Sequence, residues 1–183
     1  MNVEKYTERV RGFIQSAQSL AVREGHQQFS PLHILKVLLD DNEGLAGGLI
    51  DRAGGNSRAI LKATEAELNK LPKVSGGGAG QIYLAPATAR LFDAAEQAAD
   101  KAGDSFVTVE RLLLALTLDK DSEAGKILAQ GGVTAQNLNA AINALRKGRT
   151  ADSATAENAY DALKKYARDL TQAARDGKLD PVI

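Results

Sequence analysis

The side chains best placed for chemistry are two carboxylates, Asp104 and Glu110, on either side of a predicted helix start at Thr108. Asp104 directly follows Gly103, where the preceding helix is expected to stop, and Glu110 is two residues beyond Thr108. A carboxylate in the first turn complements the positive end of a helix, and one after a helix stop can cap a turn. By themselves, these types and spacings indicate structural roles and no reaction.

The two histidines of the chain, His26 and His33, are the next candidates, as metal ligands. A protein metal site usually has three or four ligands, and the positions three and four residues after His33 are Lys36 and Val37. We therefore expect no metal site. His33 is predicted to be a core or interface residue of a buried helix, and His26 a solvated residue in a turn.

Signatures of catalysis and nucleotide binding are missing from the sequence. The glycine-rich run at 76–80 is not followed by lysine, and the Gly-Lys pairs at 125–126 and 177–178 are followed by Ile127 and Leu179. A Walker loop needs Lys and then a hydroxyl residue after its second glycine. The chain has no cysteine and no Gly-x-Ser-x-Gly elbow. We expect no catalytic residue, no cofactor and no enzymatic activity in this chain.

Composition bounds the class of protein. The chain has 183 residues, equal numbers of basic and acidic residues at 23 each, 44% hydrophobic residues and 4% aromatic residues. A zero net charge argues against nucleic-acid and anionic-membrane partners, which select a basic excess. The sequence contains no long apolar run and no amino-terminal signal core, which together with the lack of cysteine predicts a cytoplasmic protein.

The elements that position these residues begin with four predicted helices in the first half of the chain. The first spans about 3–24 and stops at Gly25, and the second runs from a cap at Ser30 to residue 39. The second is almost wholly apolar, so we expect it to be central and buried. A third carries apolar residues at 45–50, and a fourth is capped at Asn56 or Ser57 and ended by Pro72.

The same pattern recurs 78 residues later. Gly25 corresponds to Gly103, Ser30 to Thr108 and Gly54 to Gly132, and the apolar positions also align without a gap. Because caps, breakers and core positions coincide together, we infer an internal duplication. The predicted fold is all-α, with repeat one at 1–72 and repeat two at 82–147, packed as a pseudo-two-fold pair.

Two further segments complete the predicted organisation. Residues 148–158 are predicted to be a flexible linker because they are small and polar. Residues 159–183 contain a short helical pattern followed by an extended end, and they have no core of their own. We interpret them as the edge of another domain.

Several motifs resemble the Clp ATPases. The strings LPKVSGGG at 71–78, YL at 83–84 and GDSFVTVERLLLAL at 103–116 resemble the amino-terminal domain of the ClpB-type protein disaggregases. The string FSPLHIL at 29–35 resembles the matching first repeat. The strings ALKKYARDLT at 162–171 and GKLDPVI at 177–183 resemble the beginning of a first AAA+ ATPase domain.

The resemblance implies a substrate-recognition module of an ATP-dependent chaperone that solubilises aggregated proteins together with the DnaK chaperone system. The module would bind exposed apolar segments of unfolded or aggregated polypeptides. ATP, Mg²⁺ and a homohexameric ring would belong to the parent protein, and residues 159–183 to its first ATPase domain. This chain would be monomeric, without cofactor, and would bind neither nucleic acid nor membrane.

The resemblance also implies positions for the binding site. Thr7, Asp104 and Glu110 match substrate-contact residues of the family, with Thr7 in the first helix and the two carboxylates on the rim of a groove. That groove is expected between the repeats, formed by the first helix of each half with Val10, Phe13 and Leu91. An alternative is an adaptor-docking domain of a ClpA/ClpC-type unfoldase, and a third reading is a stand-alone helical enzyme or ligand carrier.

Overall fold

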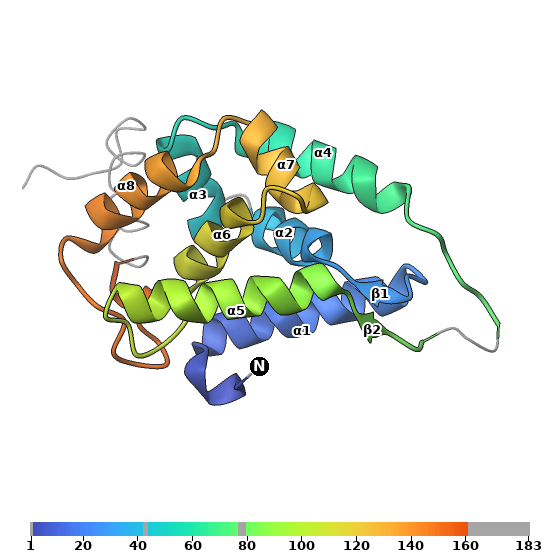
Figure 1. Ribbon diagram of the computed structural model, residues 1–183, viewed down its shortest axis with the longest axis horizontal. Coiled ribbons are helices and arrows are strands. Elements are labelled where there is room, and N and C mark those ends of the chain that lie inside the picture. The colour runs from blue at the N-terminus through green and yellow to red at the C-terminus, as the bar shows by residue number, and fades with distance from the viewer. Residues whose placement is uncertain (1, 42–43, 77–79, 161–183) are drawn as a thin grey trace, which may run out of the picture.

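Helices account for most of the chain in the computed structural model, which describes residues 2–41, 44–76 and 80–160 (Figure 1). The all-α prediction is confirmed, with two very short strands added. The elements are, in chain order, η1 (Val3–Lys5), α1 (Glu8–Arg23), β1 (Gln28–Phe29), α2 (Pro31–Asp40), α3 (Leu45–Arg52), α4 (Ser57–Asn69), β2 (Tyr83–Leu84), α5 (Pro86–Lys101), α6 (Val109–Leu118), α7 (Glu123–Gln130) and α8 (Ala135–Arg146).

Side-chain caps decide where most of these helices begin. Ser30, Thr108 and Thr134 each accept a hydrogen bond from a backbone N–H of the first turn, as predicted for Ser30 and Thr108. The first helix differs from its prediction, because it begins at Glu8 and a separate 3₁₀ turn precedes it. The reason is Thr7, which is extended and whose side chain accepts from the Val10 amide. Thr7 is therefore the N-cap of α1 and not a residue within the helix.

The duplication is confirmed at the level of helix bounds. Shifting α1, α2 and α3 by 78 residues gives the bounds of α5, α6 and α7, and α8 ends one residue before the shifted α4. The glycines that end the first helix of each half, Gly25 and Gly103, both have positive φ, at 73° and 77°. A left-handed residue at this place is what lets the chain turn back after the helix.

The core is built around the second helix of each half. In Figure 1, α2 and α6 lie in the middle of the molecule, with α1 and α5 along one edge and α4 and α7 along the other. Almost every side chain of α6 is buried, as are most of those of α2. The sequence predicted this position for α2 from its continuous apolar content, and α6 follows by the repeat.

The two halves exchange contacts reciprocally, which is the expected signature of a pseudo-two-fold pair. Helix α3 packs on α6 while α7 packs on α2, and α4 packs on α7 while α8 packs on α3. The short strands follow the same rule: Phe29 in β1 pairs in parallel with Leu84 in β2, and Val107 forms a parallel bridge with Tyr6. Shifted by 78 residues, Phe29–Leu84 becomes Val107–Tyr6 with the order of the halves reversed. Each half therefore completes the other, although the sequence did not predict these strands.

The segment after α8 differs from the prediction of a free linker at 148–158. Ala151, Glu157 and Tyr160 are buried, and the backbone around Ala151 and Ala154 is hydrogen-bonded to the body of the domain. In Figure 1 this orange-to-red stretch runs beside the C-terminal end of α5 and the start of α1. Small polar composition suggested flexibility, but buried hydrogen-bond partners hold the segment in place. Of the predicted start of another domain at 159–183, residues 161–183 lie outside the described residues.

Candidate functional site

The groove expected between the first helices of the two halves is not formed by the residues predicted for it. Val10 and Leu91 are almost fully buried in the hydrophobic core. Phe13 is partly buried and borders a small hollow of about 290 Å³ beside Leu38 and Leu45. The periodicity that placed Val10 and Leu91 on an inward face was correct, but that face packs against the domain itself. The three residues do not share one surface.

Asp104 and Glu110 are brought together in a buried arrangement around Arg146 at the end of α8. Arg146 donates from Nη1 to Asp104 Oδ1 at 2.6 Å, from Nε to Glu110 Oε2 at 3.3 Å and from Nη2 to Thr108 Oγ1 at 2.9 Å. Asp104 Oδ2 also accepts from Arg111 Nε at 3.1 Å. These contacts belong to a polar cluster that consists of Thr7, Asp104, Thr108, Glu110, Arg111, Arg146 and Glu157.

Thr7 joins this cluster through the segment that follows α8. Its Oγ1 donates to Glu157 Oε2 at 2.7 Å, and the same carboxylate oxygen accepts from the Val109 amide at 3.1 Å. Tyr160 donates its hydroxyl to Glu110. The side chains of Asp104 and Glu110 are fully covered. The prediction that these two carboxylates form an exposed rim is therefore wrong for this conformation, because the protein's own side chains surround them.

Burial and pairing set the protonation of the polar cluster. Burial alone would raise the pKa of Asp104, but hydrogen bonds from Arg146, the Ala151 amide and Arg111 outweigh it, so the pKa is lowered. Burial raises the pKa of Glu157 even though Thr7 and the Val109 amide bond to it. Asp104 is therefore held as an anion, whereas burial disfavours the ionised form of Glu157.

The first repeat carries a neutral version of one contact in this cluster. His26 and His33 occupy the positions equivalent to Asp104 and Arg111, and His26 Nδ1 lies 2.9 Å from His33 Nε2. His33 Nδ1 accepts from the Ser30 amide, so the proton of a neutral His33 is on Nε2 and is donated to His26. The expectation that His26 is solvated is wrong, since it is buried. In both halves, a hydrogen bond between side chains seven positions apart therefore joins the turn after the first helix to the start of the second helix.

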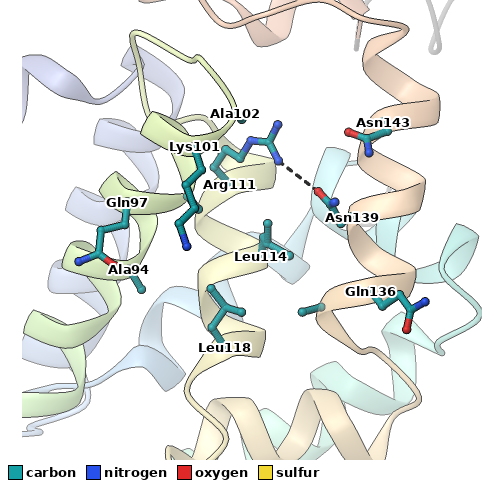
Figure 2. A pocket seen from close by; sticks show the side chains of 12 residues that line it. Ala94, Gln97, Lys101, Ala102, Arg111, Leu114, Leu118, Gln136, Asn139 and Asn143 are labelled. Carbon is teal, nitrogen blue, oxygen red and sulfur yellow. Dashed lines mark hydrogen bonds between the residues drawn. The ribbon is translucent and has the colours of Figure 1, made fainter.

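An open groove with an apolar floor lies in the second half, between α5, α6 and α8. It has a volume of about 590 Å³ (Figure 2). Its lining residues are Ala94, Gln97, Ala98, Lys101, Ala102, Arg111, Leu114, Leu118, Ala135, Gln136, Asn139 and Asn143.

The groove has a distinct chemical layout. Figure 2 shows Leu114 and Leu118 of α6 facing the space between α5 and α8, and half of the Leu118 surface is exposed. The α5 wall carries alanines, which leave room, and the α8 wall carries amide side chains such as Asn139 and Asn143. At one end, Arg111 donates to Asn139 Oδ1 at 3.4 Å. Apolar side chains can therefore be buried along the floor while amides on the wall offer hydrogen bonds to a peptide backbone.

The groove was missed at the sequence level although one signal for it exists. The positions in the first repeat that match Leu114 and Leu118 are Lys36 and Asp40, which form an ion pair on the surface of α2. Two leucines at spacing four thus replace a charged pair on a helix face that is exposed in the other repeat. Comparing the repeats for such differences in polarity, and not only for their similarities, would have indicated an unpartnered apolar surface on α6.

No group of three or more His, Cys, Asp or Glu side chains in the described part of the chain is arranged to hold a metal ion. Within the same residues, none of the helices combines the length and apolar character needed to cross a bilayer.

Comparison with known proteins gives consistent results. Residues 5–131 match the family described as the Clp repeat (R) N-terminal domain. The whole chain is 91% identical to part of a "Chaperone protein ClpB" from Rhodopseudomonas palustris and 66% identical to part of one from Mesorhizobium japonicum. In both cases the chain covers 21% of the relative, so it spans about a fifth of the length of the curated relatives it matches.

Solved structures show the same fold at low sequence identity. The Hsp104 N-terminal domain from Candida albicans is similar with a TM-score of 0.72 and 22% identity, covering 83% of this chain and 98% of that structure. The N-terminal domain of the ClpV1 ATPase from E. coli is similar with a TM-score of 0.64 and 21% identity, covering 79% of this chain and 87% of that structure.

Proposed function

The chain belongs to the Clp repeat N-terminal domain family, and on that premise we propose that it is the substrate-recognition module of a ClpB-type chaperone. Its task is to bind exposed apolar segments of unfolded or aggregated polypeptides. The ATP-driven unfolding, the hexameric ring and the cooperation with a DnaK-type chaperone system belong to the parent protein in this proposal.

The observation that carries the proposal is the groove between α5, α6 and α8. Leu118 is a large apolar side chain with half of its surface exposed, and it continues the apolar floor that begins at Leu114. A solvent-exposed apolar surface with a polar border is characteristic of a binding site. Because α5 contributes alanines, the groove is wide enough to accept side chains of varied shape, as a recognition module for many clients requires.

Binding in this groove follows from simple energetics. Each Å² of apolar surface removed from water contributes about 25 cal/mol, whatever the sequence of the client. The amides of Gln97, Gln136, Asn139 and Asn143 can bond to the backbone of an extended segment, which is also independent of sequence. An open groove covers only one side of its ligand, so the affinity is modest and the client can be passed on. The groove therefore suits general recognition of unfolded chains.

The test places a charge on the groove wall. We expect Ala98→Glu to weaken the binding of a permanently unfolded, fluorescently labelled polypeptide at least tenfold, which corresponds to about 1.4 kcal/mol, because a carboxylate on the groove wall opposes apolar burial. The matched control is Ala63→Glu, at an exposed position of α4 away from the groove. Titration followed by anisotropy measures both variants, and circular dichroism checks their helix content.

Equal affinities of the two variants for the unfolded polypeptide would contradict the groove as the client site. Saturable binding of one folded protein, undisturbed by excess unfolded polypeptide, would instead support the adaptor-docking alternative.

A further inference from the structure

Residues 151–160, called the strap below, lie against the body of the domain through their backbone. The Ala151 carbonyl accepts from the amides of Ser105 at 2.9 Å and Phe106 at 3.2 Å, and the Ala154 carbonyl accepts from the Glu8 amide at 2.8 Å. The Ala151 amide donates to Asp104 Oδ1 at 3.0 Å. The strap therefore contacts the two places where α1 and α6 begin, which belong to different repeats.

Side chains of the strap complete the polar cluster. Glu157 accepts from Thr7 and from the first amide of α6, and Tyr160 donates to Glu110. In addition, Arg9 Nη2 donates to Asn158 Oδ1 at 2.7 Å. Without the strap, Thr7 would lose the acceptor of its hydroxyl proton, and Glu110 would lose its tyrosine donor. The cluster is thus a receptor site that the strap occupies.

The attachment combines polar contacts with the burial of two side chains, Ala151 and Tyr160, while half of the strap stays exposed. Asp152, Ser153, Thr155, Asn158 and Ala159 are exposed. Within the polar cluster, the carboxylates of Asp104, Glu110 and Glu157 outnumber the guanidinium groups of Arg111 and Arg146. One buried oxygen of Glu110 and one of Glu157 have no hydrogen-bond partner.

Net hydrogen-bond contributions are only about 0.5–1.5 kcal/mol each, whereas burial of incompletely paired carboxylates is costly. The cost of the incompletely paired carboxylates opposes the gain from the hydrogen bonds and from burial of Tyr160, so it reduces the net free energy that holds the strap on the domain. Segments of this kind open locally without unfolding the domain.

We propose that the strap is a reversible intramolecular ligand of the polar cluster, so that the domain exists with the strap docked or released. In the docked state Thr7 and Glu110 hold the strap and are not available to a client polypeptide. The role of Thr7 and Glu110 in this proposal is to hold the strap on the domain. The groove between α5, α6 and α8 remains open whether the strap is docked or released.

Release of the strap has two physical consequences. A freed ten-residue segment behaves as a coil and adds on the order of 15–20 Å of reach to whatever follows it. Release also removes the Ala151 amide from Asp104, whose other oxygen bonds to Arg111 at one end of the groove. The docking of the strap and the end of the groove therefore share one carboxylate, so that each can influence the other.

The experiment is residue-resolved amide hydrogen exchange on the 183-residue chain, without any client. The reporters are the amides of Glu8, Ser105 and Phe106, which the strap covers. In the unmodified protein we expect them to exchange faster than the central amides of α2. In Glu157→Ala we expect a further increase of at least tenfold at the reporters and no change in α2. The matched control is Asp152→Ala, an exposed carboxylate of the same segment.

The result that overturns the proposal is reporter exchange as slow as that of α2 in the unmodified protein, or no acceleration in Glu157→Ala. If Glu157→Ala accelerates α2 equally, the strap is an integral part of the core, and the proposal is again wrong.

Tyr160→Phe removes only one hydroxyl, so it provides a second variant with a milder perturbation. We expect it to accelerate exchange at the reporter amides twofold to fivefold. None of these readouts depends on client binding, so a failure of the groove proposal would be seen separately.

Discussion

Among individual residues, the contrast between His26–His33 and Asp104–Arg111 shows how one structural position can be served by different chemistry. Both pairs join the turn after the first helix of a repeat to the first turn of the second helix. The histidine pair does this without charge, since Ser30 fixes the proton of His33. In the second repeat a charged pair became part of a larger network with Arg146. The histidine pair loses its neutral form when the pH falls far enough to protonate it. The lowered pKa of Asp104, by contrast, keeps that carboxylate ionised in the physiological range.

The pH dependence of stability is expected to report the histidine pair. Burial, followed by repulsion from His26, lowers the pKa of His33 to about 4 in the folded protein. The unfolded chain therefore binds the proton more readily, and the stability present above pH 6.5 falls as the pH decreases from 6.5 towards 4. Urea unfolding at pH 7 and pH 5 measures how much unfolding free energy is lost between the two pH values. We expect this loss to be about 2 kcal/mol larger in the unmodified protein than in His33→Gln. The glutamine amide of the variant does not titrate, and its oxygen can still accept a hydrogen bond at the capping position. Equal losses of unfolding free energy in the unmodified protein and in His33→Gln would contradict the assignment of the pH dependence to His33.

Among the elements, caps and left-handed glycines repeat more faithfully than any other feature. Asn56 and Thr134 are equivalent residues of different types, yet each accepts from the amide three residues ahead. Gly54 and Gly132 precede them with φ of 100° and 87°. These local rules determine the bounds of α4 and α8 before any packing is considered. The α1/α5 pair is an exception, because Thr7 caps α1 and the equivalent Ala85 gives no side-chain cap.

Removing either equivalent cap should have a similar cost. We expect Asn56→Ala and Thr134→Ala each to lower the free energy of unfolding by about 1 kcal/mol, because an amide at the helix start loses its acceptor. Ser19→Ala, at an exposed position inside α1, is the control and should show no loss. Chemical denaturation of the three variants measures the differences. A loss confined to one repeat would show that the two caps are not equivalent in energy.

At the scale of the whole molecule, the repeats depend on each other at close range. A Cβ added to Gly131, at the end of α7, would stand 2.4 Å from Ile60 Cγ1 in α4 of the other repeat. Ile60 is almost completely buried. Together with the reciprocal strand pairings, this close approach explains why the two halves form one core.

Overpacking this contact between the repeats should destabilise the protein. We expect Gly131→Ala to lower the free energy of unfolding by roughly 1–3 kcal/mol, since the buried Ile60 cannot move away freely. Gly12→Ala is the matched control, because nothing lies within 4 Å of the added carbon inside α1. The control should raise stability by about 0.5–1 kcal/mol. Thermal unfolding distinguishes the two, and a neutral or stabilising Gly131→Ala would indicate that the repeats fit loosely.

The sequence by itself determined the helices apart from the start of α1, the caps at Ser30 and Thr108, the duplication and the buried position of α2, because local residue patterns carry each of these signals. A family resemblance named Thr7, Asp104 and Glu110 as substrate-contact residues, and that role stays a prediction. Only the tertiary structure decided that this group is buried beneath residues 151–160, and that Val10 and Leu91 face the core. It alone placed the open groove on α6 next to α5 and α8. The physical reason is that periodicity identifies an apolar face, but what covers that face depends on segments distant in sequence.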